Sequence, residues 1–290
     1  MDKLTPISID QNTFLRHHYA LPALPAIVTR VQAAIHSNNV DTKELVQLIS
    51  ADPSLVAQIL KIINSAYYGI PREISDLRFA IAYLGLNEIH RLVLSLTVLN
   101  TLSIKENDEL SKFWFHSYFT ALCTKHLAKK FEPLLPMEEL WPAAILHDIG
   151  KLIYLKFFAN HYRALNKYTV EQGCLFSEAE SRFDLPASSF LGSLLCDHWR
   201  LPAIVRKACE FHSLKNLREV TAGGENTGFI RIICLGNLMA VLATDILNQD
   251  KKYEIAEATK KSLNYTEEQF LSLMGEVYQI KIEVESCKMF

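Results

Sequence analysis

The sequence predicts an all-α protein, on three observations. Apolar residues recur at helical spacing along most of the chain, and helix-start and helix-stop residues interrupt them at short intervals. No run of strand-like alternation is bounded by turns; the alternating stretch 280–284 could equally continue a helix. With 290 residues, 49% of them hydrophobic and 21% charged, the chain can form a substantial core.

Capping residues mark the helices of the first hundred residues. Asp41 with Glu44 has the pattern of a capping box, and Asp52-Pro53 joins an N-cap to a proline at the first helical position. We expect the next helix to lie between Ser75 and Gly85, and another to run from Asn87 to about Leu102.

The polar, acidic segment Ile104–Leu110 predicts a hinge between two helical lobes. A long buried helix should follow over 113–131, and two shorter helices should flank residues 147–148. We therefore expect a first lobe over 1–105, a second over 106–250 and a helical extension over 251–290.

Later helix starts are predicted from similar signals. Ser177 with Glu180 resembles a capping box, and Asp184-Leu185-Pro186 predicts a further start. An apolar helix is expected over about 227–247, and Thr266 should begin the last one.

Composition limits the partners and the cellular compartment that we expect for this chain. A net charge of −2 gives no global basic field for nucleic acid or anionic membrane, so neither is expected as a partner. The six cysteines show no spacing typical of zinc sites and predict buried, reduced thiols in a cytoplasm. The chain begins without a signal-like region, and its longest apolar run, 92–102, is too short to span a bilayer.

The tetrapeptide His147-Asp148-Ile149-Gly150, followed by Lys151, carries the chemistry. A neighbouring imidazole and carboxylate can bind one divalent ion if a turn directs both into a common cavity. Further ligands must come from other helices, and His116, His212 and Asn237 are polar residues in largely apolar surroundings.

The order of His116, His147-Asp148 and Asn237 resembles that of the HD superfamily of metal-dependent phosphohydrolases, in which the last residue is an aspartate. The amide of Asn237 is a weaker ligand than a carboxylate, so one negative charge is missing.

Motifs of the first lobe make the resemblance more specific. Together with His147–Lys151 and Trp199-Arg200-Leu201-Pro202, they resemble the HDOD domain, an HD-related output domain of bacterial signalling proteins, over about residues 14–215. These motifs are Leu21-Pro22-Ala23-Leu24-Pro25, Asp52-Pro53, Asn64-Ser65-Ala66-Tyr67-Tyr68-Gly69, Ala80-Ile81 and Leu84-Gly85.

The related HD-GYP hydrolases of cyclic dinucleotides fit less well. Their pattern has a histidine where this chain has Leu185-Pro186, and a His-His pair where it has His212-Ser213. The Gly-Tyr-Pro loop after Lys151 is absent, so the resemblance implies too few ligands for two ions.

Two interpretations of the motif remain open. His147 and Asp148 could form a hydrogen-bonded pair that ties two helices together, which we favour, or could hold one ion with His116 and Asn237 as a weak fourth ligand. Lys151 could contact a phosphate but is more simply a solvated side chain. His212 could be a remnant ligand but is more simply a helix-end histidine.

The resemblance implies a non-catalytic signalling or regulatory module of a bacterial cytoplasm. It would bind a protein partner or a nucleotide, with no cofactor beyond a single divalent ion. The chain reads as a stand-alone HDOD protein, because no receiver, kinase or cyclase segment accompanies it. The alternative is a one-metal phosphohydrolase in which the ion activates water. A third hypothesis is a sensor that binds nucleotide without turnover.

Overall fold

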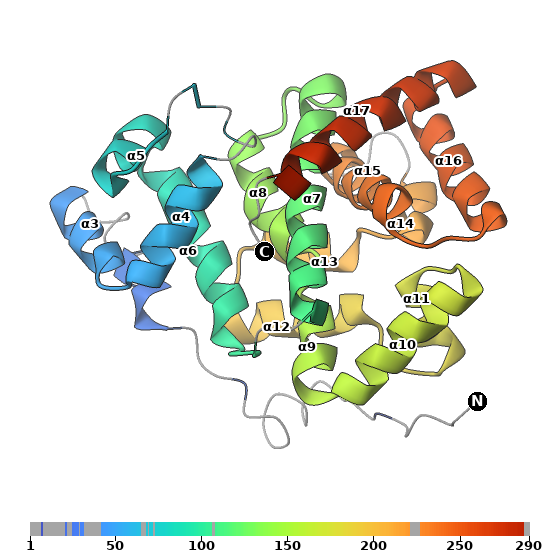
Figure 1. Ribbon diagram of the computed structural model, residues 1–290, viewed down its shortest axis with the longest axis horizontal. Helices are drawn as coiled ribbons and strands as arrows, with labels where there is room; N and C mark the ends of the chain where they lie inside the picture. The colour runs from blue at the N-terminus through green and yellow to red at the C-terminus, as the bar shows by residue number, and fades with distance from the viewer. Residues whose placement is uncertain are drawn as a thin grey trace. The chain divides into compact units, whose positions relative to one another are not determined.

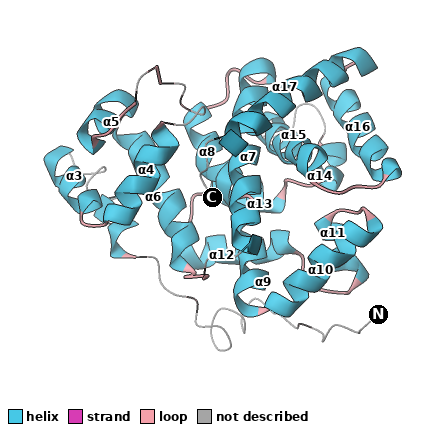
Figure 2. Ribbon diagram, viewed as in Figure 1, coloured by secondary structure: helices cyan, strands magenta, loops and turns pink. Residues whose placement is uncertain are grey.

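The computed structural model describes residues 42–64, 68, 70–71, 73–105, 108–220 and 227–286, and a few isolated positions before residue 42. Every regular element in these ranges is a helix, which confirms the all-α prediction (Figures 1 and 2). The chain divides into two compact units, one mainly of residues 104–282 and the other mainly of 22–103 with 283–289. The division between them falls at residue 104, where the polar segment Ile104–Leu110 begins.

The smaller unit contains four described helices, which pack around fully buried residues such as Ile59 and Ile89. The predicted capping residue Asp41 lies outside the described residues. Asp52 caps the second helix as predicted, because its carboxylate accepts a hydrogen bond from the Leu55 N–H at 3.1 Å. The helices are α3 (Thr42–Ser50), α4 (Pro53–Ile63), α5 (Leu77–Leu84) and α6 (Leu86–Thr101).

The side chain of Asn64, at the end of α4, fixes a distant stretch of backbone. Its amide donates to the carbonyl of Ile74 and its carbonyl oxygen accepts from the Ile74 N–H, both at 2.7 Å. The same amide also donates to the carbonyl of Leu60 at 2.9 Å. Asn64 therefore ends its helix and also satisfies both backbone groups of a buried residue.

We expect Asn64→Ala to destabilise this unit by about 2 kcal/mol, because it leaves the buried backbone groups of Ile74 without partners. Urea unfolding followed by far-UV circular dichroism would measure the loss. Asn100→Ala is the matched control, since Asn100 is exposed and its side chain donates to the half-buried side chain of Gln58 and not to buried backbone. Equal effects of the two substitutions would contradict the assigned role.

The larger unit is built on the long helix α7 (Asp108–Phe131), which packs against α8 (Met137–Leu146) and α15 (Thr227–Thr244). A second layer consists of α9 (Ile149–Phe157), α12 (Ser188–Trp199) and α13 (Ala203–Glu210) (Figure 1). The remaining helices of the unit are α10 (Ala159–Gln172), α11 (Phe176–Arg182), α14 (Leu214–Glu219), α16 (Gln249–Leu263) and α17 (Glu267–Ser286).

Two predicted helix starts in this unit were wrong. α11 begins before Ser177, because the Glu178 carboxylate accepts from the Leu175 N–H at 2.9 Å and so closes the first turn there. Glu180 is thereby free to turn inward. The next helix begins at Ser188 rather than at Pro186. By contrast, Thr266 does precede the last helix, which continues through the alternating stretch 280–284.

Glycines allow helices of this unit to approach closely. A Cβ atom on Gly150 would lie 1.9 Å from the carbonyl oxygen of Ser188, and one on Gly236 would lie 2.1 Å from Oγ1 of Thr124. The first contact joins α9 to α12 and the second joins α15 to α7. Both pairs of helices carry residues of the site described below.

By length and composition α15 could cross a membrane, but 67% of it is buried inside the protein. That pattern is typical of the central helix of a folded unit. Five cysteines lie in the described residues as free thiols; all are buried except the half-buried Cys174.

Candidate metal centre

His147 and Asp148 form the junction between α8 and α9. His147 follows the last residue of α8, and Asp148 immediately precedes the first residue of α9. Both are buried, at 1% and 2% exposure. The turn between two helices that the sequence predicted therefore holds both side chains inside the protein.

His116 from α7 and Asn237 from α15 reach the same place. Nε2 of His116 lies 3.4 Å from Oδ2 of Asp148 and 3.1 Å from Oδ1 of Asn237. The amide of Asn237 donates to the carbonyl of His212 at 3.0 Å, which orients Oδ1 toward His116. The structure thus brings together all four residues that the sequence nominated as ligands.

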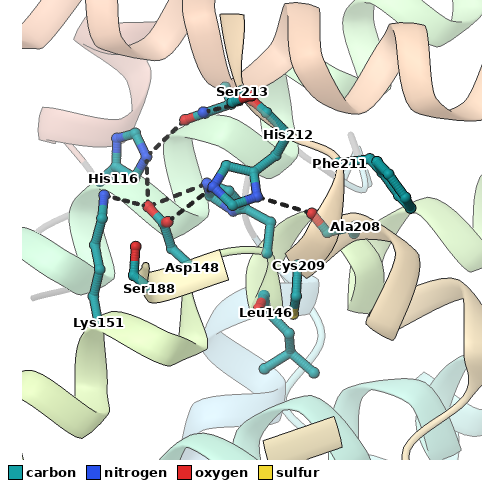
Figure 3. Close-up of polar contacts among 12 residues, drawn as sticks. His116, Leu146, Asp148, Lys151, Ser188, Ala208, Cys209, Phe211, His212 and Ser213 are labelled. Atoms are coloured by element: carbon teal, nitrogen blue, oxygen red, sulfur yellow. Dashed lines mark hydrogen bonds and ion pairs between the residues drawn. The ribbon is translucent and has the colours of Figure 1, made fainter. Parts of the chain in front are cut away.

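His212 also belongs to this cluster and is not merely a helix-end histidine. It follows α13, and its Nε2 lies 3.4 Å from Oδ1 of Asp148 (Figure 3). Its ring meets that of His147 edge to face, with ring centres 5.0 Å apart. Asp148 therefore has a histidine beside each carboxylate oxygen.

The protonation of these rings decides what they can bind. Nδ1 of His147 lies 2.6 Å from the carbonyl of Ala144, and Nδ1 of His212 lies 3.0 Å from that of Ala208. A carbonyl only accepts, so each Nδ1 carries the proton and donates it. In the neutral ring, Nε2 then keeps a lone pair directed at Asp148.

Burial lowers the pKa of His147 to about 4, despite the opposing effect of the Asp148 carboxylate, so the ring is neutral at pH 7. Its Nε2 lies 3.3 Å from Oδ2 of Asp148, and both atoms are acceptors. Within the described residues, neither Nε2 of His147 nor Oδ1 of Asp148 has a hydrogen bond. With its Nδ1–H donated to the carbonyl of Ala144, the neutral His147 ring has no N–H left for Asp148, so the two side chains lie in contact without the hydrogen bond favoured from the sequence.

Lys151 supplies one positive charge to the cluster. Its ammonium lies 2.7 Å from Oδ2 of Asp148 and its side chain is 22% exposed, so it is not the freely solvated side chain we expected. Burial alone would raise the pKa of Asp148, but Lys151, His147 and His116 together hold it well below its usual range. Asp148 is thus a carboxylate at neutral pH.

The spacing of the candidate ligand atoms fits a small divalent ion, which would displace the proton that Nε2 of His116 donates to Oδ1 of Asn237 in this structure. Two ligands each about 2.1 Å from a tetrahedral Zn²⁺ are about 3.4 Å apart. The contacts of Asp148 with His116 and His147 measure 3.4 and 3.3 Å, and the ligand atoms of the three residues all lie within 4.8 Å of one another. Imidazole with carboxylate suits Zn²⁺, Mn²⁺ or Fe²⁺.

A cavity of about 660 Å³ opens onto this cluster, with Asp148, His212 and Asn237 in its wall. Glu180 lines the same cavity and was not predicted as a site residue. It is 2% exposed, and its carboxylate accepts from the Ser188 N–H at 2.8 Å. Burial raises the pKa of Glu180 to about 7, although the bond from Ser188 acts in the opposite direction.

His147, whose pKa is lower in the folded chain than in the unfolded one, makes folding more favourable as the pH rises toward about 6.5. Against that rise we expect Glu180 to contribute a fall in stability of roughly 1–3 kcal/mol as the pH rises from about 5 to 8. The pKa of Glu180 is higher in the folded chain than in the unfolded one, so folding favours its protonated form and loses that advantage as the carboxyl ionises. Glu180→Gln should remove this fall, because the amide still accepts from Ser188. Urea unfolding at both pH values would show it, and an unchanged slope in the variant would contradict the assignment.

Sequence reasoning considered His212 as a remnant ligand but favoured a helix-end histidine, and it missed Glu180. His212 occupies the place of the His-His pair in HD-GYP hydrolases, so its position was visible but its orientation was not. Glu180 gave no such signal, because its pattern with Ser177 predicted a surface cap.

The model of the HDOD domain family matches residues 21–214. An uncharacterized protein of Treponema pallidum (strain Nichols) is 25% identical over 192 residues, which are 66% of this chain and 37% of that protein. The chain thus spans little more than a third of the length of this curated relative.

Solved structures share the fold. An HDOD domain protein with unknown function from Geobacter sulfurreducens aligns over 97% of both chains, with a TM-score of 0.70 and 20% identity. A "putative metal-dependent phosphohydrolase" from Shewanella amazonensis SB2B aligns over 94% of this chain and 95% of that one, with a TM-score of 0.64 and 19% identity. Since the family model covers more than half of the residues, the chain belongs to the HDOD domain family.

Proposed function

We propose that this HDOD protein is a regulatory module that binds one divalent metal ion at His116, His147 and Asp148, with Asn237 as a fourth, weaker ligand. The observation that carries the proposal is the orientation of His147. Its only N–H is donated to Ala144, so an imidazole lone pair faces a carboxylate across 3.3 Å with no proton between them. A divalent ion would satisfy both groups.

The cluster supports binding more than turnover. A bimetallic hydrolase needs two ions that clamp the attacking and leaving oxygens. Pro186 stands where the resemblance to HD-GYP enzymes called for a further histidine, and its carbonyl instead accepts a hydrogen bond from the hydroxyl of Tyr154. We therefore propose a signalling role in a bacterial cytoplasm, in which a protein partner or a small ligand reads the state of the pocket.

A one-metal phosphohydrolase is the second candidate, and Glu180 is the observation that favours it. A carboxyl group with a pKa of about 7 in the cavity wall is suited to general acid–base work. In that scheme the ion would lower the pKa of a bound water, and Lys151 would hold a phosphate.

Metal analysis of the purified full chain tests the proposal. We expect about one Zn²⁺ or Mn²⁺ per chain after equilibration and dialysis, and loss of that ion in His147→Ala. His161→Ala is the matched control, since His161 lies on α10 outside the cluster and should leave the metal content unchanged. A chain without metal, or equal metal in His147→Ala, would overturn the proposal.

The same samples separate the two candidates. With added Mn²⁺, the regulatory module should release no phosphate from nucleotides above the rate of His147→Ala. Release that depends on both His147 and Glu180 would establish the enzyme instead.

A further inference from the structure

Two buried cysteines lie against each other next to the candidate metal centre. Cys196 on α12 and Cys209 on α13 are 1% and 0% exposed, and their Sγ atoms are 3.8 Å apart. Neither is among the proposed metal ligands. We propose that Cys196 and Cys209 form a redox site, which a peroxide oxidises to a reversible disulfide, and that this disulfide weakens the binding of the ion. Only the second part rests on the proposed function.

The two thiols form a hydrogen-bonded chain that ends beside His147. Sγ of Cys209 lies 3.3 Å from the carbonyl oxygen of Leu146, the residue that precedes His147 (Figure 3). Since a carbonyl oxygen only accepts, Cys209 donates its proton to Leu146. Its sulfur then accepts from the thiol of Cys196. The reduced pair therefore holds the stretch of backbone that carries His147.

The pair is placed for a disulfide between two consecutive helices. A disulfide has an S–S distance of about 2.05 Å, so the sulfur atoms of Cys196 and Cys209 have to approach each other by about 1.8 Å. Rotation of the two side chains supplies most of this movement. The helices already pack closely here, because a Cβ atom on Gly192 of α12 would lie 3.1 Å from Cβ of Cys209.

Oxidation by hydrogen peroxide needs no further reactant. The two S–H bonds and the O–O bond break, one S–S bond forms, and two molecules of water are released. Each sulfur gives up one electron, and the peroxide accepts both. Exchange with a small thiol reverses the reaction.

The disulfide would alter the backbone next to the metal centre. It has no S–H, so the carbonyl of Leu146 loses the donor that Cys209 supplies in the reduced state. The ring of His147 is oriented by its bond to the carbonyl of Ala144, in the same turn of chain. A shift of this turn therefore moves Nε2 of His147 away from the other ligands.

A bound ion would in turn restrict access to the thiols. The contact with Cys196 and burial hold the pKa of the Cys209 thiol well above its usual range, so the closed protein reacts slowly. Oxidation then requires local opening of the short helix α13. The ion opposes that opening, because its ligand Asn237 donates to the carbonyl of His212, which follows α13. The ion and the disulfide favour different positions of α13, so each disfavours the other.

Treatment of the full chain with hydrogen peroxide, followed by proteolysis without reductant and mass spectrometry, tests the redox site. We expect a linked pair of peptides that contain Cys196 and Cys209, and its loss after dithiothreitol. Competition with a fluorescent chelator should give an affinity for Mn²⁺ about tenfold lower in the oxidised protein. Mn²⁺ suits this measurement, because thiols bind it weakly. Saturation with Mn²⁺ before the peroxide is added should slow formation of the link.

Variants separate this disulfide from other oxidation. Cys196→Ala cannot form the link but keeps the bond from Cys209 to Leu146, so peroxide should leave its affinity for Mn²⁺ unchanged. Cys123→Ala is the matched control, since Cys123 is equally buried but lies on α7, and it should respond to peroxide as the unchanged protein does.

The outcomes distinguish the two proposals. Absence of the link between Cys196 and Cys209, or a link that leaves the affinity for Mn²⁺ unchanged, would overturn this inference and leave the metal centre standing. A link in a chain that binds no ion even when reduced would overturn the proposed function and sustain the redox site.

Discussion

Gly150→Ala should destabilise the larger unit by roughly 3 kcal/mol. The new Cβ would lie 1.9 Å from the carbonyl oxygen of Ser188 and 2.5 Å from the backbone nitrogen of Gly192, so α9 and α12 would have to move apart. Backbone atoms cannot rotate away as a side chain can. The gain of about 1 kcal/mol from alanine in a helix is too small to offset this overlap. Urea unfolding followed by circular dichroism measures the change.

Gly275→Ala provides the control, because both glycines lie inside helices of the described structure. Apart from the backbone of its own helix, no atom of the described residues would lie within 4 Å of a Cβ at Gly275. Helix propensity alone then predicts an increase in stability of about 0.5–1 kcal/mol. Opposite signs for the two substitutions would establish close packing at Gly150, whereas a stabilised Gly150→Ala would show that α9 and α12 are not so close.

Asn237→Asp should tighten the binding of a divalent ion at least tenfold, or by about 1.4 kcal/mol. Oδ1 of Asn237 already lies 3.1 Å from Nε2 of His116, so the substitution places a carboxylate oxygen at an existing position and adds one negative charge. The loss of the hydrogen bond to the carbonyl of His212 opposes this gain but leaves the larger charge effect. Competition with a fluorescent chelator would measure the affinity.

Asn160→Asp adds the same charge on α10, where Asn160 accepts a bond from the exposed Arg163. It should leave the affinity for the ion unchanged, which separates a ligand effect from a general effect of charge. Unchanged or weaker affinity in Asn237→Asp would exclude Asn237 from the metal site.

The fold was predictable because its signals are local. The caps at Asp52 and Thr266 and the stop at Gly85 each depend on residues a few positions apart, and the structure confirms them. The starts near Ser177 and Pro186 were wrong for a related reason. Competing capping residues lie within one turn of each other there, and tertiary contacts select among them.

The site was predictable only in part, because its decisive features are not local. The positions of His116, His147, Asp148 and Asn237 could be nominated from their order along the chain. No spacing in the sequence shows that His147 donates Nδ1–H to the carbonyl of Ala144. Nor does it show that His212 turns toward Asp148 or that Glu180 turns away from solvent. The orientations of these three side chains depend on how α8, α11 and α13 end relative to the neighbouring helices.

The contact between Lys151 and Asp148 bears on the stability of the protein when no ion is bound. The ammonium gives the buried carboxylate a counter-charge of its own, so removal of an ion would not leave Asp148 bare. A structural zinc domain unfolds when it is stripped, since nothing takes the place of the metal. Here the ammonium of Lys151 already lies 2.7 Å from Oδ2 of Asp148 and can replace the charge of the ion. Under the proposed function, the occupancy of the site can rise and fall with the supply of the ion while the scaffold persists, which is the property that a reversible sensor requires.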